Sequence, residues 1–304
     1  MVNEAIDLLL GIQNEDGGWG SFKGKRSSTE STSFALMALK SLESNFYDRQ
    51  ATAGLKWLLQ HQKEDGSFSL NDTSKQSSWM TPIAVLAILP FKDKNEHALR
   101  ASKWVLTQEG RTPGWVVSLL VRLSLVKKVT ELDPSLAGWS WTAGAFSWVE
   151  PTSYSLMALK KLKRSLGGTN CDERIRQGEM LIYDRMCENG GWNYGNSRVL
   201  GKALWPYPDV TAVALIALQD RAASEANQKS LRALDGMMRE TASGTALGWG
   251  IICLTIYNQD IQEWKKVLMK TFEKTKFLGE TKAIALALLA FGNGAVCFVP
   301  ESQR

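Results

Sequence analysis

The sequence contains few of the residues that metal sites and disulfide networks require. Its 304 residues include four Cys and two His, and the Cys are far apart, with no C-x-x-C pair. This usage indicates neither a zinc knuckle nor a disulfide framework. We therefore expect no bound metal and no other cofactor.

Concentrated positive charge is also missing. Lys and Arg number 36 against 31 Asp and Glu, which gives a formal net charge of +5. The positive residues are scattered along the chain and form no basic arm interleaved with aromatics. This distribution predicts a solvated surface and no nucleic-acid partner.

Long hydrophobic runs are absent as well. The most apolar run, residues 283–291, ends at a Gly-Asn-Gly turn, well short of the roughly 20 residues of a membrane-spanning helix. The chain begins Met1-Val2-Asn3, without the basic and apolar regions of a secretion signal. These features predict a cytoplasmic location. Peripheral membrane contact stays open as an alternative, supported only by scattered Lys and Arg and the apolar residues 296–299.

Tryptophan is abundant, with 12 residues, and part of it belongs to an internal repeat. Residues 13–19 run from a Gln through a Gly-containing turn to an aromatic, and residues 62–68 repeat this pattern 49 positions later. Degenerate copies lie at 108–115 and 187–192. Each copy precedes a helix rich in Leu and Ala, led by a threonine: Thr32, Thr81, Thr152 and Thr211.

A period of roughly 50 residues without a strand signal favours paired helices. The first helix of each pair is amphipathic, and the second is apolar on most faces, as buried helices are. About six such pairs fit a closed double ring better than an open array, which needs polar caps at both ends. We predict an all-α single domain over residues 1–304, with Trp19, Trp115 and Trp192 as structural staples between helices.

The Gln–Gly–Trp repeat resembles the QW motif of the squalene-hopene and oxidosqualene cyclases, whose fold the protein prenyltransferase β subunits share. This resemblance covers nearly the whole chain and implies an α/α toroid, although one fold hosts many chemistries. The prenyltransferases hold zinc with an Asp, a Cys and a His. Here His61 and His97 are expected at the surface and no Asp-x-Cys pair occurs in the C-terminal half, so zinc-dependent prenyl transfer is not expected.

Resemblance to the class II terpenoid cyclases implies a strong carboxylic acid that protonates an alkene or epoxide. The family carries this acid as the middle Asp of an Asp-x-Asp-Asp-Thr-Ala run. The matching stretch here is residues 207–212, in which Asp209 falls on the donor position. Tyr207 and Val210 replace the other two acids.

Acids also recur within the repeat itself. Glu30, Glu150 and Asp209 each lie two residues before the threonine of an inner helix. They can act as helix caps, each stabilising by about 0.5–2 kcal/mol. Alternatively, equivalent positions in a closed ring rim one central cavity, where desolvation would raise a carboxyl pKa. On this second interpretation Glu150 and Asp209 are the candidate catalytic acids, and Glu30 contributes to substrate binding.

Aromatic residues cluster before two of these acids. Residues 138–151 carry three Trp and a Phe with no helical period, and a second group precedes Asp209. A long aromatic-rich loop inside a compact domain is more often functional than not. It can form a pocket wall or a plug. The predicted substrate-binding aromatics are Trp141, Trp148, Trp205 and Tyr207.

The leading functional hypothesis is a terpenoid-cyclase-like enzyme with an apolar, aromatic-lined central cavity. It would bind an isoprenoid or similar lipid and cyclise or isomerise it by carboxylic-acid protonation. The alternative is a non-catalytic binding or scaffold protein that keeps the toroid. The incomplete acid motif favours the alternative, whereas the Trp residues around Glu150 and Asp209 favour the enzyme. The sequence identifies no protein partner.

Overall fold

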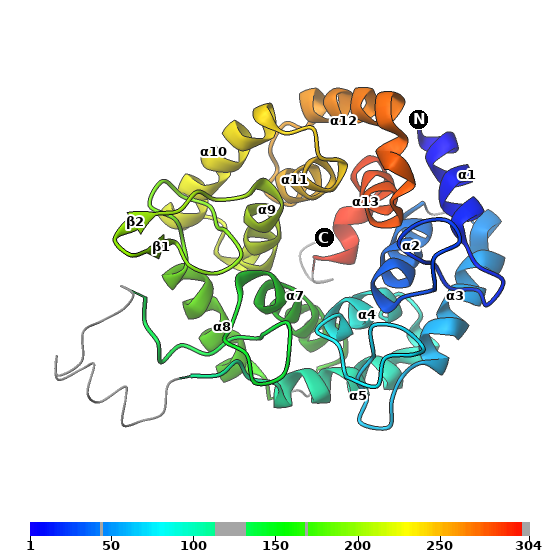
Figure 1. The fold of residues 1–304 in the computed structure, drawn as a ribbon, viewed down its shortest axis with the longest axis horizontal. Helices are drawn as coiled ribbons and strands as arrows, with labels where there is room; N and C mark the ends of the chain where they lie inside the picture. Colours follow the sequence, from blue (N-terminus) through cyan, green and yellow to red (C-terminus); the bar gives the residue numbers. More distant parts are fainter. Residues whose placement is uncertain (43–44, 113–131, 168–169, 300–304) are drawn as a thin grey trace.

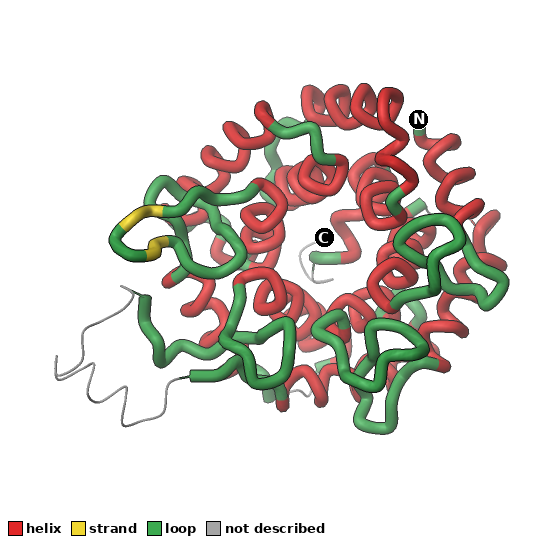
Figure 2. The backbone as a smooth tube through the Cα atoms, viewed as in Figure 1, coloured by secondary structure: helices red, strands yellow, loops and turns green. Residues whose placement is uncertain are grey.

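The computed structural model describes the chain apart from residues 43–44, 113–131, 168–169 and 300–304. Its helices form two concentric rings around one axis (Figures 1 and 2). The outer ring contains α1 (Val2–Ile12), α3 (Asp48–Gln60), α5 (Asn95–Thr107), α8 (Asp172–Asp184), α10 (Glu225–Glu240) and α12 (Gln262–Thr275). The inner ring contains α2 (Thr29–Ser41), α4 (Thr81–Ile88), α7 (Val149–Leu166), α9 (Pro208–Ala217), α11 (Gly244–Ile256) and α13 (Thr281–Phe291).

Short elements connect these helices. Among the described residues, the only strand pair is β1 (Arg198–Val199) with β2 (Lys202–Ala203), an antiparallel hairpin outside the rings. The 3-10 turns are η1 (Asn45–Tyr47), η2 (Lys92–Lys94), η3 (Gln219–Arg221), η4 (Lys276–Gly279) and η5 (Gly294–Cys297).

The ring is closed. Each inner helix packs against the next one along the chain, and α13 packs against α2. The first outer helix, α1, also packs against α13, so the first and last helical pairs lie side by side (Figure 1). The predicted closed double ring of helical pairs is therefore confirmed.

Burial separates the two rings as the sequence pattern predicts. All eight residues of α4 are buried, and nine of the eleven residues of α13 are. In the outer helix α3 only five of thirteen residues are buried, on one amphipathic face. The Ala-rich inner helices therefore supply the core, because they are covered on the outside by the outer ring and on both sides by each other.

The repeat joins the two rings through hydrogen bonds. The aromatic residue of each copy donates its backbone N–H to the threonine hydroxyl of the following inner helix, at 2.9–3.1 Å. The indole N–H of the tryptophans then donates to a carbonyl of the preceding outer helix. The four donor–acceptor pairs are Trp19–Thr32, Phe68–Thr81, Trp139–Thr152 and Trp192–Thr211.

The third of these pairs corrects the sequence analysis. Trp139, rather than Trp115, holds the staple position, with its indole N–H 2.8 Å from the Val105 carbonyl. Trp115 lies outside the described residues. The register was missed because an insertion separates Gln108 from its aromatic partner in this copy alone.

Glycine is required in the repeat turn. Gly17 and Gly66 both have φ of +90°, and a Cβ would lie 2.8 Å from the Ala53 carbonyl oxygen in the first case and 2.4 Å from that of Arg100 in the second. A side chain could not fit without moving an outer helix. In the first of these turns, the Gln13 side-chain amide donates a hydrogen bond to the Gly17 carbonyl, at 2.8 Å.

The C-terminal segment closes the ring at the C-terminal ends of the inner helices. Residues 294–299 lie in the centre of the ring (Figure 1) and contact α2, α11 and α13. Phe298 is fully buried, with its ring centroid 5.1 Å from that of Trp249. Lys161 donates to the Val296 and Val299 carbonyls, and Gln219 donates to the Phe298 carbonyl. We call residues 294–299 the C-terminal plug.

Candidate active site

The opposite end of the inner ring carries a cluster of charges. Four inner helices have an ionisable side chain at their second residue: Glu30 on α2, Glu150 on α7, Asp209 on α9 and Lys282 on α13. These groups influence one another electrostatically across the ring. We call this set the acid cluster.

Lys282 is the cation of this cluster. Its ammonium lies 2.8 Å from Glu30 Oε1, and only 17% of its side chain is exposed, against 30% for Glu30. The ammonium also lies 5.3 Å from the centroid of the Phe34 ring. Burial alone would lower the pKa of Lys282, but the acidic groups around it outweigh burial and raise that pKa well above its ordinary value.

Burial acts on the pKa of Glu150 in the opposite direction to that of Lys282. Burial raises its pKa above the ordinary 4.5, against the lowering effect of Lys282, and the negative charges of Glu30 and Asp209 raise it further. A hydrogen bond from the Tyr154 hydroxyl, at 3.3 Å, lowers it. The balance favours the neutral acid more than in an ordinary glutamate, so Glu150 is the described carboxyl of the cluster best suited to donate a proton.

Two tyrosines, Tyr154, which is buried, and Tyr194, which is half-buried, hydrogen-bond the carboxyl groups. The Tyr154 hydroxyl donates to Glu150, and the Tyr194 hydroxyl donates to Asp209 Oδ2, at 3.3 Å in each case. Burial and the nearby carboxylates raise the pKa of Tyr194 to about 12 and raise that of Tyr154 too. Both phenols therefore stay protonated near neutral pH and act as donors.

The capping interpretation is not what the described hydrogen bonds show. The side chain that caps α2 is Ser28, which accepts the Ser31 N–H, and α7 and α9 have no side-chain cap. The carboxylates of the cluster bond instead to Lys282 and to the two tyrosines. Their proximity to three helix N-termini still favours their charged forms, so the raised pKa of Glu150 reflects burial and neighbouring charge.

Aromatic rings line this end of the ring. Trp141 stacks on Trp148, with ring centroids 4.7 Å apart, and contacts both Trp79 and Tyr194. Trp79 stacks on Tyr154 at 5.9 Å. Each aromatic group is thus connected to a carboxyl: Trp79 to Glu150 through Tyr154, and Trp141 to Asp209 through Tyr194.

Of the predicted binding aromatics, Trp141, Trp148 and Tyr207 belong to this group, Tyr207 through its contact with Tyr194. Trp205 lies apart from this group. Its side chain is 78% exposed and makes no ring contact among the described residues. Trp205 is near Asp209 in sequence, but it lies in the loop between β2 and α9, next to the β1–β2 hairpin outside the rings (Figure 1).

Sequence reasoning missed three members of the site. Trp79 stands two residues before Thr81, the position that holds an acid in three other copies, so the repeat register could have located it. Tyr154 lies one turn after Glu150 on α7. Lys282 is the one charged residue of α13, and a lone lysine in so apolar a helix is itself a signal.

The described residues include no group of three or more His, Cys, Asp or Glu arranged to hold a metal ion. The histidines contact neighbours in the repeat: His61 Nδ1 lies 2.7 Å from the Trp57 carbonyl and His97 Nδ1 lies 2.6 Å from Gln62 Oε1. Within the described part of the chain, no helix has the length and hydrophobicity to cross a membrane.

Comparison with known families agrees with this architecture. Residues 2–111 match the model of the prenyltransferase alpha-alpha toroid domain. The fold is an α/α toroid. The resemblance to the squalene-hopene cyclase and prenyltransferase repeat superfamily is confirmed by this match and by the solved structures below. None of the curated proteins matches the sequence.

Three solved structures illustrate the likeness. A type II terpene cyclase from Scytonema, in complex with its substrate geranylgeranyl dihydroxybenzoate, has a TM-score of 0.60 at 12% identity, covering 97% of each chain. The same cyclase with its product merosterolic acid A gives 0.59 at 13%, covering 97% of this chain and 95% of that one. An alpha-amylase from Clostridium perfringens gives 0.59 at 12%, covering 96% and 97%. At these identities the likeness concerns the toroid fold alone, and the two chemistries differ.

Proposed function

We propose that the protein is a terpenoid-cyclase-like isomerase, in which Glu150 protonates a double bond of an isoprenoid-like substrate bound at the acid cluster. The observation that carries the proposal is the environment of Glu150, a mostly buried carboxyl with a raised pKa beside aromatic rings. The prenylated ligand of the Scytonema cyclase supports an isoprenoid-like substrate class.

The reaction follows from the groups present. Glu150 transfers its proton to one alkene carbon, forming a C–H bond and leaving a carbocation on the neighbouring carbon. A second double bond of the same molecule then attacks the cation and closes a ring. Loss of a proton from the product cation to water restores an alkene, and the Glu150 carboxylate takes up a proton from water. Atoms and charge balance without a co-reactant, so the net reaction is an isomerisation.

The neighbouring residues have separate roles in this proposal. Once Glu150 is ionised, the positive charge of Lys282 stabilises the new carboxylate, which makes the transfer more favourable. The π faces of Trp79, Trp141 and Trp148 stabilise the carbocation, each by about 0.5–2 kcal/mol. Asp209, the residue on the family's donor position, keeps the Glu150 pKa high through its negative charge.

The second candidate, a binding protein without turnover, also has a specific observation in its favour. The C-terminal plug lies in the centre of the ring, and Phe298 and Trp249 fill space there. A protein of this kind could hold the end of an apolar chain at the acid end without folding it for cyclisation.

One experiment separates these candidates. The purified protein is incubated in D2O with geranylgeranyl dihydroxybenzoate or geranylgeraniol, and the products are analysed by liquid chromatography and mass spectrometry. We expect an isomer carrying deuterium, lost in Glu150→Gln by at least about a hundredfold, since general acid catalysis contributes at least that much. Glu64→Gln, an exposed glutamate far from the cluster, is the matched control and should keep full turnover.

Two results would overturn the enzyme. Saturable binding of either compound with no isomer formed would favour the binding protein. Equal turnover in Glu150→Gln and in the unmodified protein would remove Glu150 from the chemistry.

A further inference from the structure

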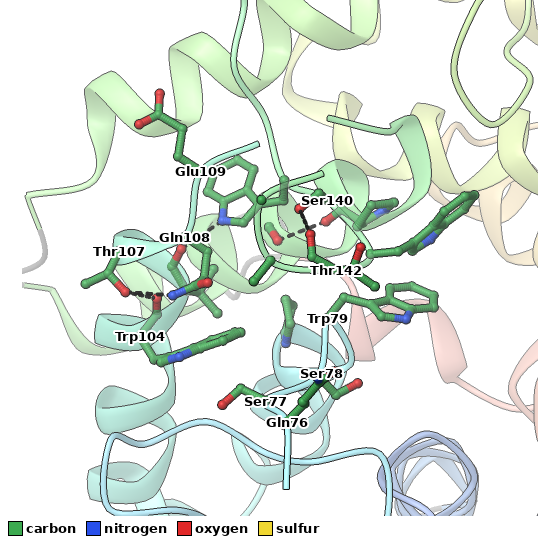
Figure 3. Close-up of a pocket in the computed structure, with 18 of the residues that line it drawn as sticks. Gln76, Ser77, Ser78, Trp79, Trp104, Thr107, Gln108, Glu109, Ser140 and Thr142 are labelled. Carbon is green, nitrogen blue, oxygen red and sulfur yellow. Dashed lines mark hydrogen bonds between the residues drawn. The ribbon is translucent and has the colours of Figure 1, made fainter. Parts of the chain in front are cut away.

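A pocket of about 810 Å³ lies on the flank of the ring, between the hairpin loops that precede α4 and α7. Figure 3 shows Trp104 from the outer helix α5 on one side and Trp79 on the other, with Ser140 and Thr142 above and Gln76 below. Its volume falls within the range of about 300–1,000 Å³ usual for small-molecule sites. We call it the flank pocket.

The lining of the flank pocket is neutral and hydrogen-bonding. Four of its twenty lining residues are tryptophans and nine carry a hydroxyl or a carboxamide. Lys and Arg are absent from the lining, and its one carboxylate, Glu109, is exposed. An anion would lack a counter-charge, and a cation would have only a solvated one.

One tryptophan of the pocket, Trp141, differs from the structural staples in its hydrogen bonds. The indole N–H groups of Trp19, Trp139 and Trp192 each donate to a backbone carbonyl, at 2.6–2.8 Å. In the described part of the chain, Trp141 Nε1 is buried without any partner. A buried indole N–H usually finds an acceptor, because leaving it unpaired costs about 1–3 kcal/mol.

These features discriminate between ligand classes. An isoprenoid in the flank pocket would cover the exposed Gln76 carboxamide and the hydroxyl groups of the lining without adding a hydrogen bond to any of them. A ligand with many hydroxyl groups would pair them. A sugar ring also presents an apolar C–H face that packs on indole rings such as those of Trp104 and Trp79.

We infer that the flank pocket binds a short neutral saccharide, with its sugar rings against Trp104 and Trp79 and its hydroxyl groups bonded to the carboxamide and hydroxyl lining. The inference is independent of the proposed chemistry at Glu150. The flank pocket shares Trp79 and Trp141 with the aromatic group at the acid end. A bound sugar would therefore contact two of the tryptophans that also belong to that aromatic group.

The test uses maltotriose and cellotriose, which present α- and β-linked glucose rings, with the full-length protein. Isothermal titration calorimetry gives the affinity, and saturation-transfer NMR with irradiation of the aromatic protons reports on ring contact. We expect saturable binding of at least one trisaccharide at millimolar concentration. Trp104→Ala should weaken it at least about tenfold by removing the stacking face, and Gln76→Ala should weaken it by removing a hydrogen-bonding group.

Controls keep the result interpretable. Trp205→Ala removes an exposed tryptophan outside the flank pocket and should leave the affinity unchanged. If Trp104→Ala lowers the melting temperature, Trp104→Phe retains an aromatic face, and Gln76 is exposed and can be replaced without loss of packing. Absence of binding by both sugars would overturn the inference. So would unchanged affinity in both Trp104→Ala and Gln76→Ala, or displacement of a bound sugar by geranylgeraniol.

Discussion

The two ends of the inner ring are built from the same helices, but their polar groups have different partners. At the C-terminal end, the plug occupies the ring, and its backbone carbonyls accept hydrogen bonds from Lys161 and Gln219. Phe298 packs on Trp249 beside them. Polar groups there serve to hold one segment of the chain in place.

At the N-terminal end, side chains from four helices act on each other's charge. Glu30 and Lys282 form an ion pair, and Glu150 is left with a pKa raised by burial. The comparison shows that one ring of repeated helices has two different ends. A segment of the chain fills the ring at the C-terminal end, and ionisable side chains at the second residue of four inner helices meet at the N-terminal end. Chemistry is therefore expected at the acid cluster alone.

The largest effect should come from breaking the closed end. Phe298→Ala removes a fully buried ring and leaves a cavity, so we expect a loss of about 3–5 kcal/mol in the free energy of unfolding, measured by denaturant titration. Leu200→Ala, at an 86% exposed site, should change it by less than about 0.5 kcal/mol. A loss below about 1 kcal/mol in Phe298→Ala would mean that the plug does not stabilise the ring.

At the acid end, the next largest effect should follow removal of the cation. Lys282→Met leaves Glu30 beside Glu150 without a counter-charge, and we expect a loss of about 1–3 kcal/mol, below that of a fully buried pair because both side chains are partly exposed. The double variant Glu30→Gln/Lys282→Met should recover much of this loss. If the double variant is less stable than Lys282→Met, the ion pair is not what the substitution disturbs.

Much of the fold was accessible from the sequence because the repeat is local. The threonines that lead the inner helices and the glycines of the turns sit at fixed distances from each other, and each distance reflects a hydrogen bond or a close contact. An insertion defeated this reasoning at Trp139. Nothing in the residues around Gln108 indicates that its aromatic partner comes 31 positions later.

The site was harder to predict from the sequence because its residues come together only when the ring closes. Lys282 meets Glu30 only because α13 packs against α2, a contact between residues 252 positions apart. Trp205 shows the converse: it is near Asp209 in sequence, yet its side chain is 78% exposed and makes no ring contact with the aromatic group among the described residues.

A smaller effect should follow loss of one staple bond between the rings. Thr152→Val removes the hydroxyl that accepts the hydrogen bond of the buried backbone N–H of Trp139, and we expect a loss of about 1–2 kcal/mol in unfolding free energy. Thr255→Val is the matched control, because its hydroxyl donates to the Ile251 carbonyl within its own helix. Equal losses in the two variants would argue against a specific role for the staple.

The smallest effect concerns pH. Since burial raises the folded-state pKa of Glu150 above its unfolded value, the folded protein binds more protons between the two values, and stability falls as pH rises through that window. Glu150→Gln lacks this group, so its advantage over the unmodified protein should grow from about pH 4.5 upward, by at most about 1.4 kcal/mol per pH unit. Thermal unfolding of both proteins across this range measures the difference. A difference that shrinks as pH rises would reverse the sign of the pKa shift.

The most direct test of the account is the pKa of Glu150 itself. Protein labelled with carbon-13 at the glutamate side-chain carboxyl is titrated by NMR, and comparison with Glu150→Gln identifies the signal. The account predicts a midpoint above the ordinary 4.5, moving higher still in Lys282→Met as the lowering effect of the cation is lost. A midpoint at or below 4.5 would show that Glu150 is an ordinary ionised carboxylate, and the acid cluster would then have no residue prepared to donate a proton.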